Sequence, residues 1–346
     1  MCVAGPATLK DVAAAAGVSV STASRVLRGD LGLVGAETAA RVREVAAELD
    51  YHPSAAAQAL VRGRTRTVGV TYQYPHLGHY SPMLSLAADI VREYGYRLLH
   101  YPLHLSTDLD AEIASPLRER RVDILVLAGV VGADHAHEWI ASEYQQVVSI
   151  GVAAADDPAP SIPSACWSDA EGIRMAADYL ISLGHRHLLH LGAADTIKTA
   201  TFQRAVDAAG VRASWVETEF GLGSGLMAEG ARLMRQALAL PDRPTAVLAR
   251  NDEIAIGALH AAAEDGIRVP DDISIMGYYD VPVSEFTAPS LSTVSAPFCD
   301  CLEAVLRPAL QAACDEDEEY PGAGRVWFPT RLVIRKSTGP APEHTP

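Results

Sequence analysis

The sequence predicts an α/β protein with a small all-α head at the N-terminus and a core of two lobes, each built on a parallel sheet. Two observations predict this arrangement. Residues 8–53 carry small apolar residues at helical spacing, with hydroxyl and glycine signals at the predicted helix ends. From residue 67 onward, short apolar runs alternate with longer helical stretches, as in parallel sheets buried on both faces. A chain of 346 residues is long enough for two or three domains.

The first two helices are predicted on either side of a tight turn. Thr8 is a hydroxyl N-cap with Asp11 three residues later, which is the spacing of a capping box. Gly17 ends the first helix, because glycine tolerates positive φ, and Ser19 caps the second. The residues expected to face inward are Val12, Ala13, Ala16, Ala23, Val26 and Leu27. Short helices with small packing residues and a three-residue turn indicate a helix-turn-helix, with an ordinary helical hairpin as the alternative.

The N-terminal segment resembles the DNA-binding head of the lactose-repressor (LacI-type) family of bacterial transcription regulators. Residues 8–28 carry the resemblance as T-L-K-D-V-A-A-A-A-G-V-S-V-S-T-A-S-R-V-L-R. It continues through A-E-T-A-A-R-V-R-E-V-A-A-E-L-D-Y-H-P at 36–53 and R-G-R-T-R-T-V-G-V at 62–70. The resemblance implies a head over 1–52, a hinge over 53–66 and a sensor core similar to the periplasmic-binding-protein fold.

The resemblance also implies which residues contact double-stranded DNA. Val20 and Ser21 are expected at base edges in the major groove, and Arg25 is expected to bond a guanine. The hydroxyl residues are candidates for phosphate contacts, with local capping as the alternative role. Leu60 matches a family leucine that wedges into the minor groove from a hinge that becomes helical on DNA, whereas a disordered linker is the alternative. The expected contact residues are Thr8, Ser19, Val20, Ser21, Thr22, Ser24, Arg25, Tyr51, Ser54, Ala57 and Leu60.

The charge distribution is compatible with DNA binding by the head alone. The net charge of the chain is −15, but residues 1–67 hold eight basic and six acidic residues, a net of +2, which leaves −17 for the rest. A mildly basic head on an acidic body keeps the body away from phosphates. Affinity is therefore expected to depend strongly on salt and to need two heads acting together on a pseudo-palindromic operator.

The core is predicted to contain two βα series joined by crossing segments. Buried parallel strands are expected at 67–72, 96–101, 122–128, 146–152, 187–192, 214–220, 245–249 and 273–278, and connecting helices at 85–94 and 111–120. Crossings between lobes are expected at 156–164, 291–296 and 328–335. The N-terminal lobe is expected to comprise 67–163 with 297–328, and the C-terminal lobe 164–296 with 329–340. Residues 341–346 are expected to be a disordered tail, and the absence of leucine repeats there predicts a homodimer.

The resemblance places an effector between the lobes, at the carboxyl ends of the strands. His79 and Tyr80 occupy the place of the family's N-P-F-F segment. Lys198 stands where the family has a clamping arginine, and lysine lacks that residue's bidentate fork. Tyr279 replaces the first aspartate of the family's G-F-D-D-I-P. The expected ligand-binding residues are His79, Tyr80, Lys198, Phe220, Asn251 and Tyr279.

These departures from the family pattern predict a flat, aromatic cleft. A saccharide or sugar derivative is the expected effector, with a nucleobase-like or other ring-bearing metabolite as the alternative. Packing between lobes is the alternative role for several aromatic residues, and the preferred one for Tyr72, Tyr74 and Trp167.

Several other functional classes are not favoured by the sequence. The five cysteines do not form a disulfide framework, and Cys299-Asp300-Cys301 lacks a second ligand pair for a metal. There is no H-E-x-x-H, G-x-S-x-G or Walker motif, so neither an enzyme nor a cofactor is expected. The chain shows no secretory signal and no apolar run of bilayer length, which predicts a cytoplasmic protein without a membrane partner. The rival function is a small-molecule sensor that has lost DNA binding.

Overall fold

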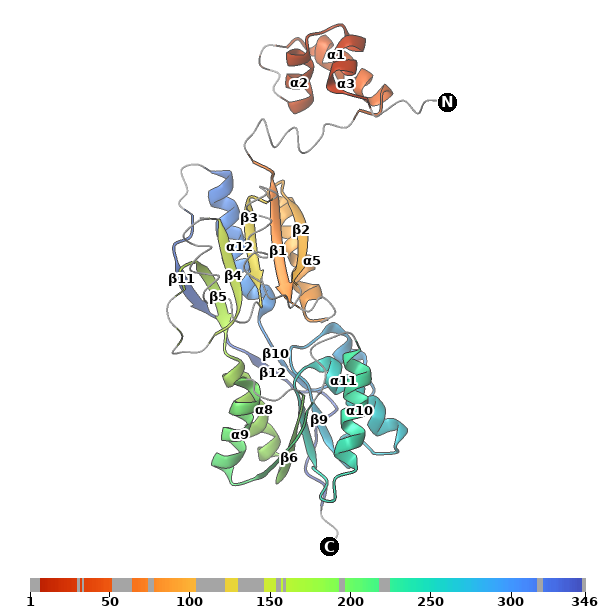
Figure 1. Ribbon diagram of the computed structural model, residues 1–346, viewed down its shortest axis with the longest axis vertical. Coiled ribbons are helices and arrows are strands. Elements are labelled where there is room, and N and C mark those ends of the chain that lie inside the picture. Colours follow the sequence, from red (N-terminus) through yellow and green to blue (C-terminus); the bar gives the residue numbers. More distant parts are fainter. Residues whose placement is uncertain are drawn as a thin grey trace. The chain divides into compact units, whose positions relative to one another are not determined.

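The chain forms two compact units, Met1–Arg66 and Thr67–Pro346, in a computed structural model (Figure 1). The structure describes residues 7–29, 32, 34–51, 64–73, 78–103, 122–129, 146–153, 157, 160–192, 197–217, 225–315 and 320–343.

The head consists of three helices whose ends are set by local capping. They are α1 (Leu9–Ala16), α2 (Val20–Arg28) and α3 (Ala36–Glu48). The Thr8 amide donates to the Asp11 carboxylate at 2.8 Å, and the Thr8 hydroxyl accepts from the Asp11 amide at 3.4 Å, which completes the predicted capping box. Gly17 ends α1 at φ 67°, in the left-handed region. The predicted helix-turn-helix is confirmed.

Small apolar residues allow the three helices of the head to pack closely. The buried residues of this core are Val12, Ala13, Ala16, Ala23, Val26, Ala39, Val42 and Ala46. Leu27, expected inside, is half-buried and packs at the edge of the same core. The opposite side of α2 stays free of core contacts, and that side carries the residues expected to meet DNA.

The first sheet of the core has six parallel strands in the order β11-β5-β4-β3-β1-β2. Helices α5 (Tyr80–Glu93) and α12 (Phe298–Cys314) contact each other and this sheet. The central strand β3 is buried along its whole length, as its apolar sequence predicts. The strands are β1 (Thr67–Gln73), β2 (Arg97–Leu103), β3 (Ile124–Ala128), β4 (Val147–Val152), β5 (Pro163–Trp167) and β11 (Gly324–Trp327).

The second sheet has four parallel strands in the order β7-β6-β8-β9, with two pairs of helices on its two sides (Figure 1). The strands are β6 (His187–Leu191), β7 (Arg212–Val216), β8 (Ala246–Ala249) and β9 (Ser274–Met276). The helices are α8 (Asp169–Ser182), α9 (Ile197–Ala209), α10 (Leu226–Leu238) and α11 (Asp252–Glu264). A Cβ added at Gly257 would lie 1.9 Å from the Met227 carbonyl oxygen, so glycine lets α10 and α11 approach closely.

Three segments carry the chain between the two sheets. They lie at Ser168, at residues 296–297 and at residues 328–330. The strand β10 (Thr293–Ser295) follows the 3₁₀-helix η1 (Pro282–Phe286) and precedes the second crossing. It pairs in an antiparallel ribbon with β12 (Arg331–Val333), which follows the third crossing.

The first crossing differs from the prediction at 156–164. Residues 163–167 instead form β5, which pairs with β4 inside the first sheet, so the first lobe extends to Trp167 and the crossing follows at Ser168. The polar residue Ser164 made this segment look less like a buried strand. In the structure its hydroxyl is nevertheless buried, and it forms a hydrogen bond with the Ser149 hydroxyl of β4 at 2.6 Å. The helix expected at 111–120 and the end of the strand expected at 214–220 lie outside the described residues.

Candidate functional site

Helix α2 presents the residues that were expected to read DNA bases. Val20 is 43 % exposed, and Ser21 and Arg25 are also exposed, while Thr22 and Ser24 are half-buried. Ser21 and Arg25 are four residues apart, so they lie next to each other on the helix surface. Among its described side chains, this face carries a cation, an apolar side chain and several hydroxyls, and it can therefore meet both base edges and phosphates.

The two N-cap hydroxyls are already used within the head. The Ser19 hydroxyl accepts from the Thr22 amide at 3.1 Å and lies 2.8 Å from the Ser21 hydroxyl. The Thr8 hydroxyl belongs to the capping box of α1. Local capping thus accounts for both residues, and any phosphate contact would be additional.

Tyr51 lies at the edge of the head. Its side chain is half-buried against the head core, and its amide donates to the Ala46 carbonyl at 2.8 Å. The expected hinge contacts fall outside the described residues and are Ser54, Ala57 and Leu60.

The structure brings most of the expected ligand-binding residues together between the two sheets. The His79 ring lies 4.2 Å from the Tyr279 ring and 4.3 Å from the Tyr80 ring, measured between centroids. The Lys198 ammonium lies 4.0 Å above the Tyr279 ring. His79 and Tyr80 open α5 of the first lobe, whereas Lys198 opens α9 and Tyr279 follows β9 in the second. Side chains of both lobes therefore contact each other directly.

Asn251, another expected ligand-binding residue, serves as the N-cap of α11. Its side-chain oxygen Oδ1 accepts from the Ile254 amide at 2.9 Å, which commits that oxygen to the helix end. Phe220 lies outside the described residues.

Phe298 is a central member of this cluster that the sequence analysis missed. Its ring stacks on His79 at 4.9 Å, and Trp167 meets it edge-on at 4.5 Å. Tyr80 and Tyr279 also contact it, at 5.5 and 5.8 Å. We call these five residues, His79, Tyr80, Trp167, Tyr279 and Phe298, the interlobe aromatic cluster. One sequence signal could have identified Phe298. It directly follows Pro297 and begins a helix that comes after a crossing.

Asp169 holds the polar side of the cluster in place. Its carboxylate accepts from the Trp167 indole nitrogen at 3.0 Å and from the Tyr278 hydroxyl at 2.9 Å. The same carboxylate lies 3.5 Å from the Lys198 ammonium. Asp169 and Lys198 are both buried, so each charge depends on the other for compensation. Asp169 was not identified from the sequence, because an acidic residue in the first turn of a helix normally serves the helix dipole.

Lys198 is held by a second set of contacts as well. Its ammonium donates to the Arg250 carbonyl at 3.2 Å and lies 3.6 Å above the Tyr278 ring. Burial lowers the pKa of Lys198 to about 8, although Asp169 acts in the opposite direction. A lysine fixed in this way is a positioned point charge at the strand ends.

A hydrogen bond joins the two lobes beside the interlobe aromatic cluster. The Gly78 amide of the first lobe donates to the Glu253 carboxylate of the second at 2.6 Å. The other oxygen of Glu253 and Nδ1 of His79 are buried, and neither has a hydrogen-bond partner among the described residues. Such atoms carry a desolvation penalty that a bound polar molecule, or separation of the lobes, would relieve.

Comparisons with known proteins match both parts of the chain. Residues 8–54 match the lacI family of bacterial regulatory proteins, and residues 177–338 match a periplasmic-binding-protein-like domain. The HTH-type transcriptional regulator DegA of Bacillus subtilis is 31 % identical over 96 % of this chain and 98 % of its own length. The chain belongs to the lacI family.

Other relatives agree with this assignment. The HTH-type transcriptional repressor PurR of Mannheimia succiniciproducens is 30 % identical, over 96 % of this chain and 98 % of that protein. A lac repressor dimer bound to operator and the anti-inducer ONPF is 26 % identical with a TM-score of 0.76, covering 96 % of this chain and 99 % of that one. A regulator from Silicibacter pomeroyi shares the fold, with a TM-score of 0.81 at 23 % identity over 96 % of this chain and all of that one.

The lacI-family protein is therefore a DNA-binding transcriptional regulator with a ligand-binding core. The rival interpretation, a sensor that has lost DNA binding, is not supported, since the family match begins in the capped, fully packed head.

The cysteines of this lacI-family protein are free within the described chain. Cys299 and Cys301 both lie on α12, and residues two positions apart on a helix face different directions. The described part of the structure contains no cluster of three or more potential metal ligands. It also contains no helix with the length and apolar character needed to cross a membrane.

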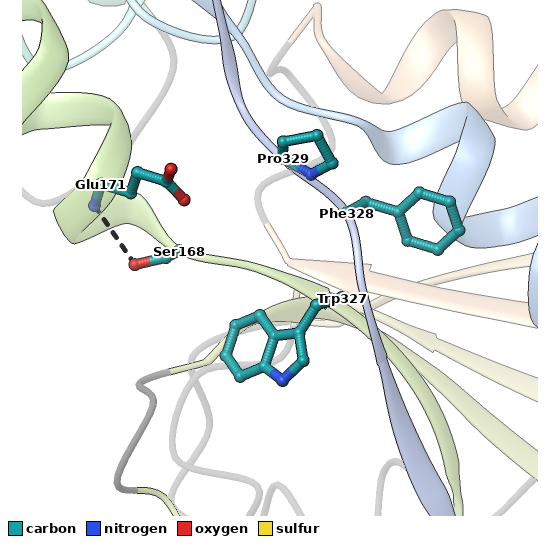
Figure 2. Close-up of a pocket in the computed structure, with 5 residues that line it drawn as sticks. All are labelled: Ser168, Glu171, Trp327, Phe328 and Pro329. Atoms are coloured by element: carbon teal, nitrogen blue, oxygen red, sulfur yellow. Dashed lines mark hydrogen bonds between the residues drawn. The ribbon is translucent and has the colours of Figure 1, made fainter.

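Two cavities of this lacI-family protein lie outside the interlobe aromatic cluster. One, of about 430 Å³, is lined by Ser168, Glu171, Trp327, Phe328 and Pro329 at two of the crossing segments (Figure 2). The other, of about 580 Å³, runs between α8 and α9. Among the described residues that line the two cavities, none is an expected ligand-binding residue. His79, Tyr80, Lys198 and Tyr279 contact one another instead.

Acid should destabilise the core through a buried histidine. Burial, assisted by the positive charge of Lys198, lowers the pKa of His190 from 6.5 to about 3. The unfolded chain takes up a proton below pH 6.5 while folded His190 stays neutral, so stability is lost as the pH falls below 6.5. Between pH 7 and pH 5, we expect the free energy of unfolding to fall by about 2 kcal/mol less in His190→Gln than in the wild type. Urea unfolding at both pH values measures this, and an unchanged pH dependence in the variant would contradict it.

Proposed function

We propose that the protein is a repressor that binds a pseudo-palindromic operator as a homodimer and changes its operator affinity when an effector binds between the core lobes. The observation that carries this proposal is the direct contact of the two lobes through the interlobe aromatic cluster and the Glu253–Gly78 hydrogen bond. Because these contacts join elements of different lobes, a molecule that inserts among them must change the lobe arrangement.

The DNA-binding half of the proposal uses the exposed face of α2. Val20 and Ser21 are expected to meet base edges, while Arg25 supplies a guanidinium for guanine. Three side chains from one head give modest affinity, so a second head on the same operator is needed. The dimeric state of the operator-bound lac repressor, a relative 26 % identical, supports the same assembly here.

An exposed apolar pair marks a surface for this dimerisation. On η1, Phe286 is 80 % exposed and Val283 is 45 % exposed. A large aromatic side chain left in water beside a second apolar residue is typical of a protein interface. We assign this surface to a second copy of the chain.

The effector half of the proposal follows from the chemistry of the cleft. Aromatic faces from both lobes surround a buried ammonium and a carboxylate, Lys198 and Asp169. Aromatic rings stack on the apolar faces of sugars, and the charged groups bond hydroxyls. A saccharide or sugar derivative fits this set, and the number of aromatic rings favours a nucleobase-like or other flat ring as the second candidate.

The mechanism is thermodynamic linkage between the cleft and the operator. An effector that binds one lobe arrangement more tightly shifts the population toward it, and DNA affinity changes by the same coupling free energy. The atoms that an effector can satisfy are already present, namely Nδ1 of His79 and the second carboxylate oxygen of Glu253.

Titration calorimetry of the full-length protein against a panel of sugars, sugar derivatives and nucleobases tests the effector site. We expect Tyr279→Asp to change the affinity for the panel member that binds the wild type by tenfold or more, since it removes the ring between His79 and Lys198. Tyr279→Phe is the matched control, because it keeps the ring and removes only the hydroxyl. Equal binding by the wild type and Tyr279→Asp would remove Tyr279 from the site.

A further inference from the structure

The cavity at the crossing segments combines walls from both lobes. Ser168 lies at the first crossing and Glu171 in the first turn of α8, in the second lobe. Trp327 ends β11 of the first lobe, and Pro329 lies in the crossing that follows it. Figure 2 shows Glu171 on one side and the Trp327–Pro329 segment on the other. A volume of about 430 Å³ is within the range of small-molecule sites.

The Glu171 carboxylate faces this cavity instead of completing a helix cap. The Ser168 hydroxyl accepts from the Glu171 amide at 3.2 Å, which is half of a capping box. At α1 the equivalent carboxylate, that of Asp11, returns to the N-cap amide at 2.8 Å. At α8 it does not, and it points away from Ser168 toward Pro329 (Figure 2). Among the described residues, none donates a hydrogen bond to the Glu171 carboxylate, so its charge is available to a ligand.

Trp327 provides the aromatic wall. Its side chain is 45 % exposed, on an edge strand of the first sheet. The guanidinium carbon of Arg325 lies 5.4 Å from the centre of the Trp327 ring, so the indole already interacts with one cation of the chain. Phe328 contributes little aromatic surface here, since its ring points away from Glu171 and packs against the core (Figure 2).

The charges around the cavity favour a positively charged ligand. Among the described residues that line the cavity, Glu171 supplies a carboxylate and none is a lysine, arginine or histidine. Arg174, three residues after Glu171 on α8, is paired with Asp178 at 2.8 Å. A carboxylate opposite an indole face is the arrangement that attracts an ammonium group, through both charge and the ring quadrupole.

We propose that this cavity binds a small organic ammonium compound, with the ammonium group between the Glu171 carboxylate and the Trp327 ring. The site is separate from the interlobe aromatic cluster, and it does not depend on the identity of the effector. Because the walls of the cavity belong to different lobes, its affinity for an ammonium compound also depends on the arrangement of the lobes.

Choline is a suitable probe, because 3,3-dimethyl-1-butanol has the same shape without the charge. We would titrate the full-length protein with each compound and follow tryptophan fluorescence and, separately, heat of binding. We expect saturable choline binding, at least about tenfold tighter than that of the neutral alcohol. Trp327→Phe should remove the fluorescence change, which assigns the signal to this residue among the four tryptophans of the chain.

The charge requirement is tested by Glu171→Gln, which keeps the size of the side chain. We expect choline affinity to fall about tenfold in this variant and to stay unchanged in Asp265→Asn, which removes an exposed carboxylate elsewhere on the second lobe. Circular dichroism verifies that each variant is folded. The proposal is overturned if choline shows no saturable binding up to about 50 mM, the weak limit for a site of this size. Equal binding of choline and the alcohol, or an unaffected Glu171→Gln variant, would also overturn it.

Discussion

Replacement of Asp169 by alanine should lower the free energy of unfolding of the core by about 3–5 kcal/mol. The substitution leaves the buried Lys198 ammonium without its counter-charge at 3.5 Å. It also leaves the Trp167 indole nitrogen and the Tyr278 hydroxyl without their acceptor. Each of these losses is costly in a buried site, and together they are expected to loosen the interlobe aromatic cluster. Urea unfolding of the full-length protein, followed by far-ultraviolet circular dichroism, measures the change.

Two further variants separate the charge from the hydrogen bonds. Asp169→Asn keeps a carbonyl oxygen for Trp167 and Tyr278 but removes the charge. The fall in its free energy of unfolding therefore measures mainly the lost charge interaction with Lys198. Adding Lys198→Met to Asp169→Asn should recover part of the lost stability, because the uncompensated cation is then gone. Strictly additive effects of the two substitutions would show that the pair is not coupled and would contradict this account.

Phe286→Asp should convert the proposed dimer to a monomer and weaken operator binding by about 100-fold or more. The side chain is 80 % exposed, so the folded chain loses little by the change, whereas a charge at the centre of an apolar interface is strongly unfavourable. With the dimer lost, each head binds its half-site independently and the avidity disappears. Sedimentation velocity and fluorescence anisotropy with a labelled operator measure the two effects.

The matched control for this prediction is Ile334→Asp, which places the same charge at another exposed apolar residue, 46 % exposed. We expect that variant to remain dimeric and to bind the operator normally. A Phe286→Asp protein that is still a dimer would show that η1 does not form the interface.

The parts of the structure that depend on local sequence could be predicted well. The capping of α1 by Thr8 and its end at Gly17 use residues only a few positions apart, so their signals are complete within the segment. Buried strands such as β3 were predicted because a short, continuous apolar run is typical of a strand covered on both faces. Family resemblance then indicated which of these elements form a cleft.

The arrangement inside the cleft could not be predicted, because it depends on residues far apart in the chain. Phe298 contacts His79, which lies more than two hundred positions earlier in the chain, and no local sequence pattern predicts that stacking. Asp169 has the sequence signature of an ordinary helix N-terminus, yet it bonds Tyr278 across the lobe. The first crossing was placed too early for the same reason, since burial of Ser164 depends on its partner Ser149 in the neighbouring strand.

The most direct test of the central claim is selection of DNA sites from a random duplex pool by the full-length protein, followed by affinity measurement at several salt concentrations. We expect a pseudo-palindromic site bound by two heads. The logarithm of the affinity should fall linearly with the logarithm of the salt concentration, and Arg25→Ala should weaken binding to the selected site by about tenfold or more. Equal affinity for selected and scrambled duplexes at about 0.15 M salt, a concentration that suppresses non-specific binding, would contradict the claim.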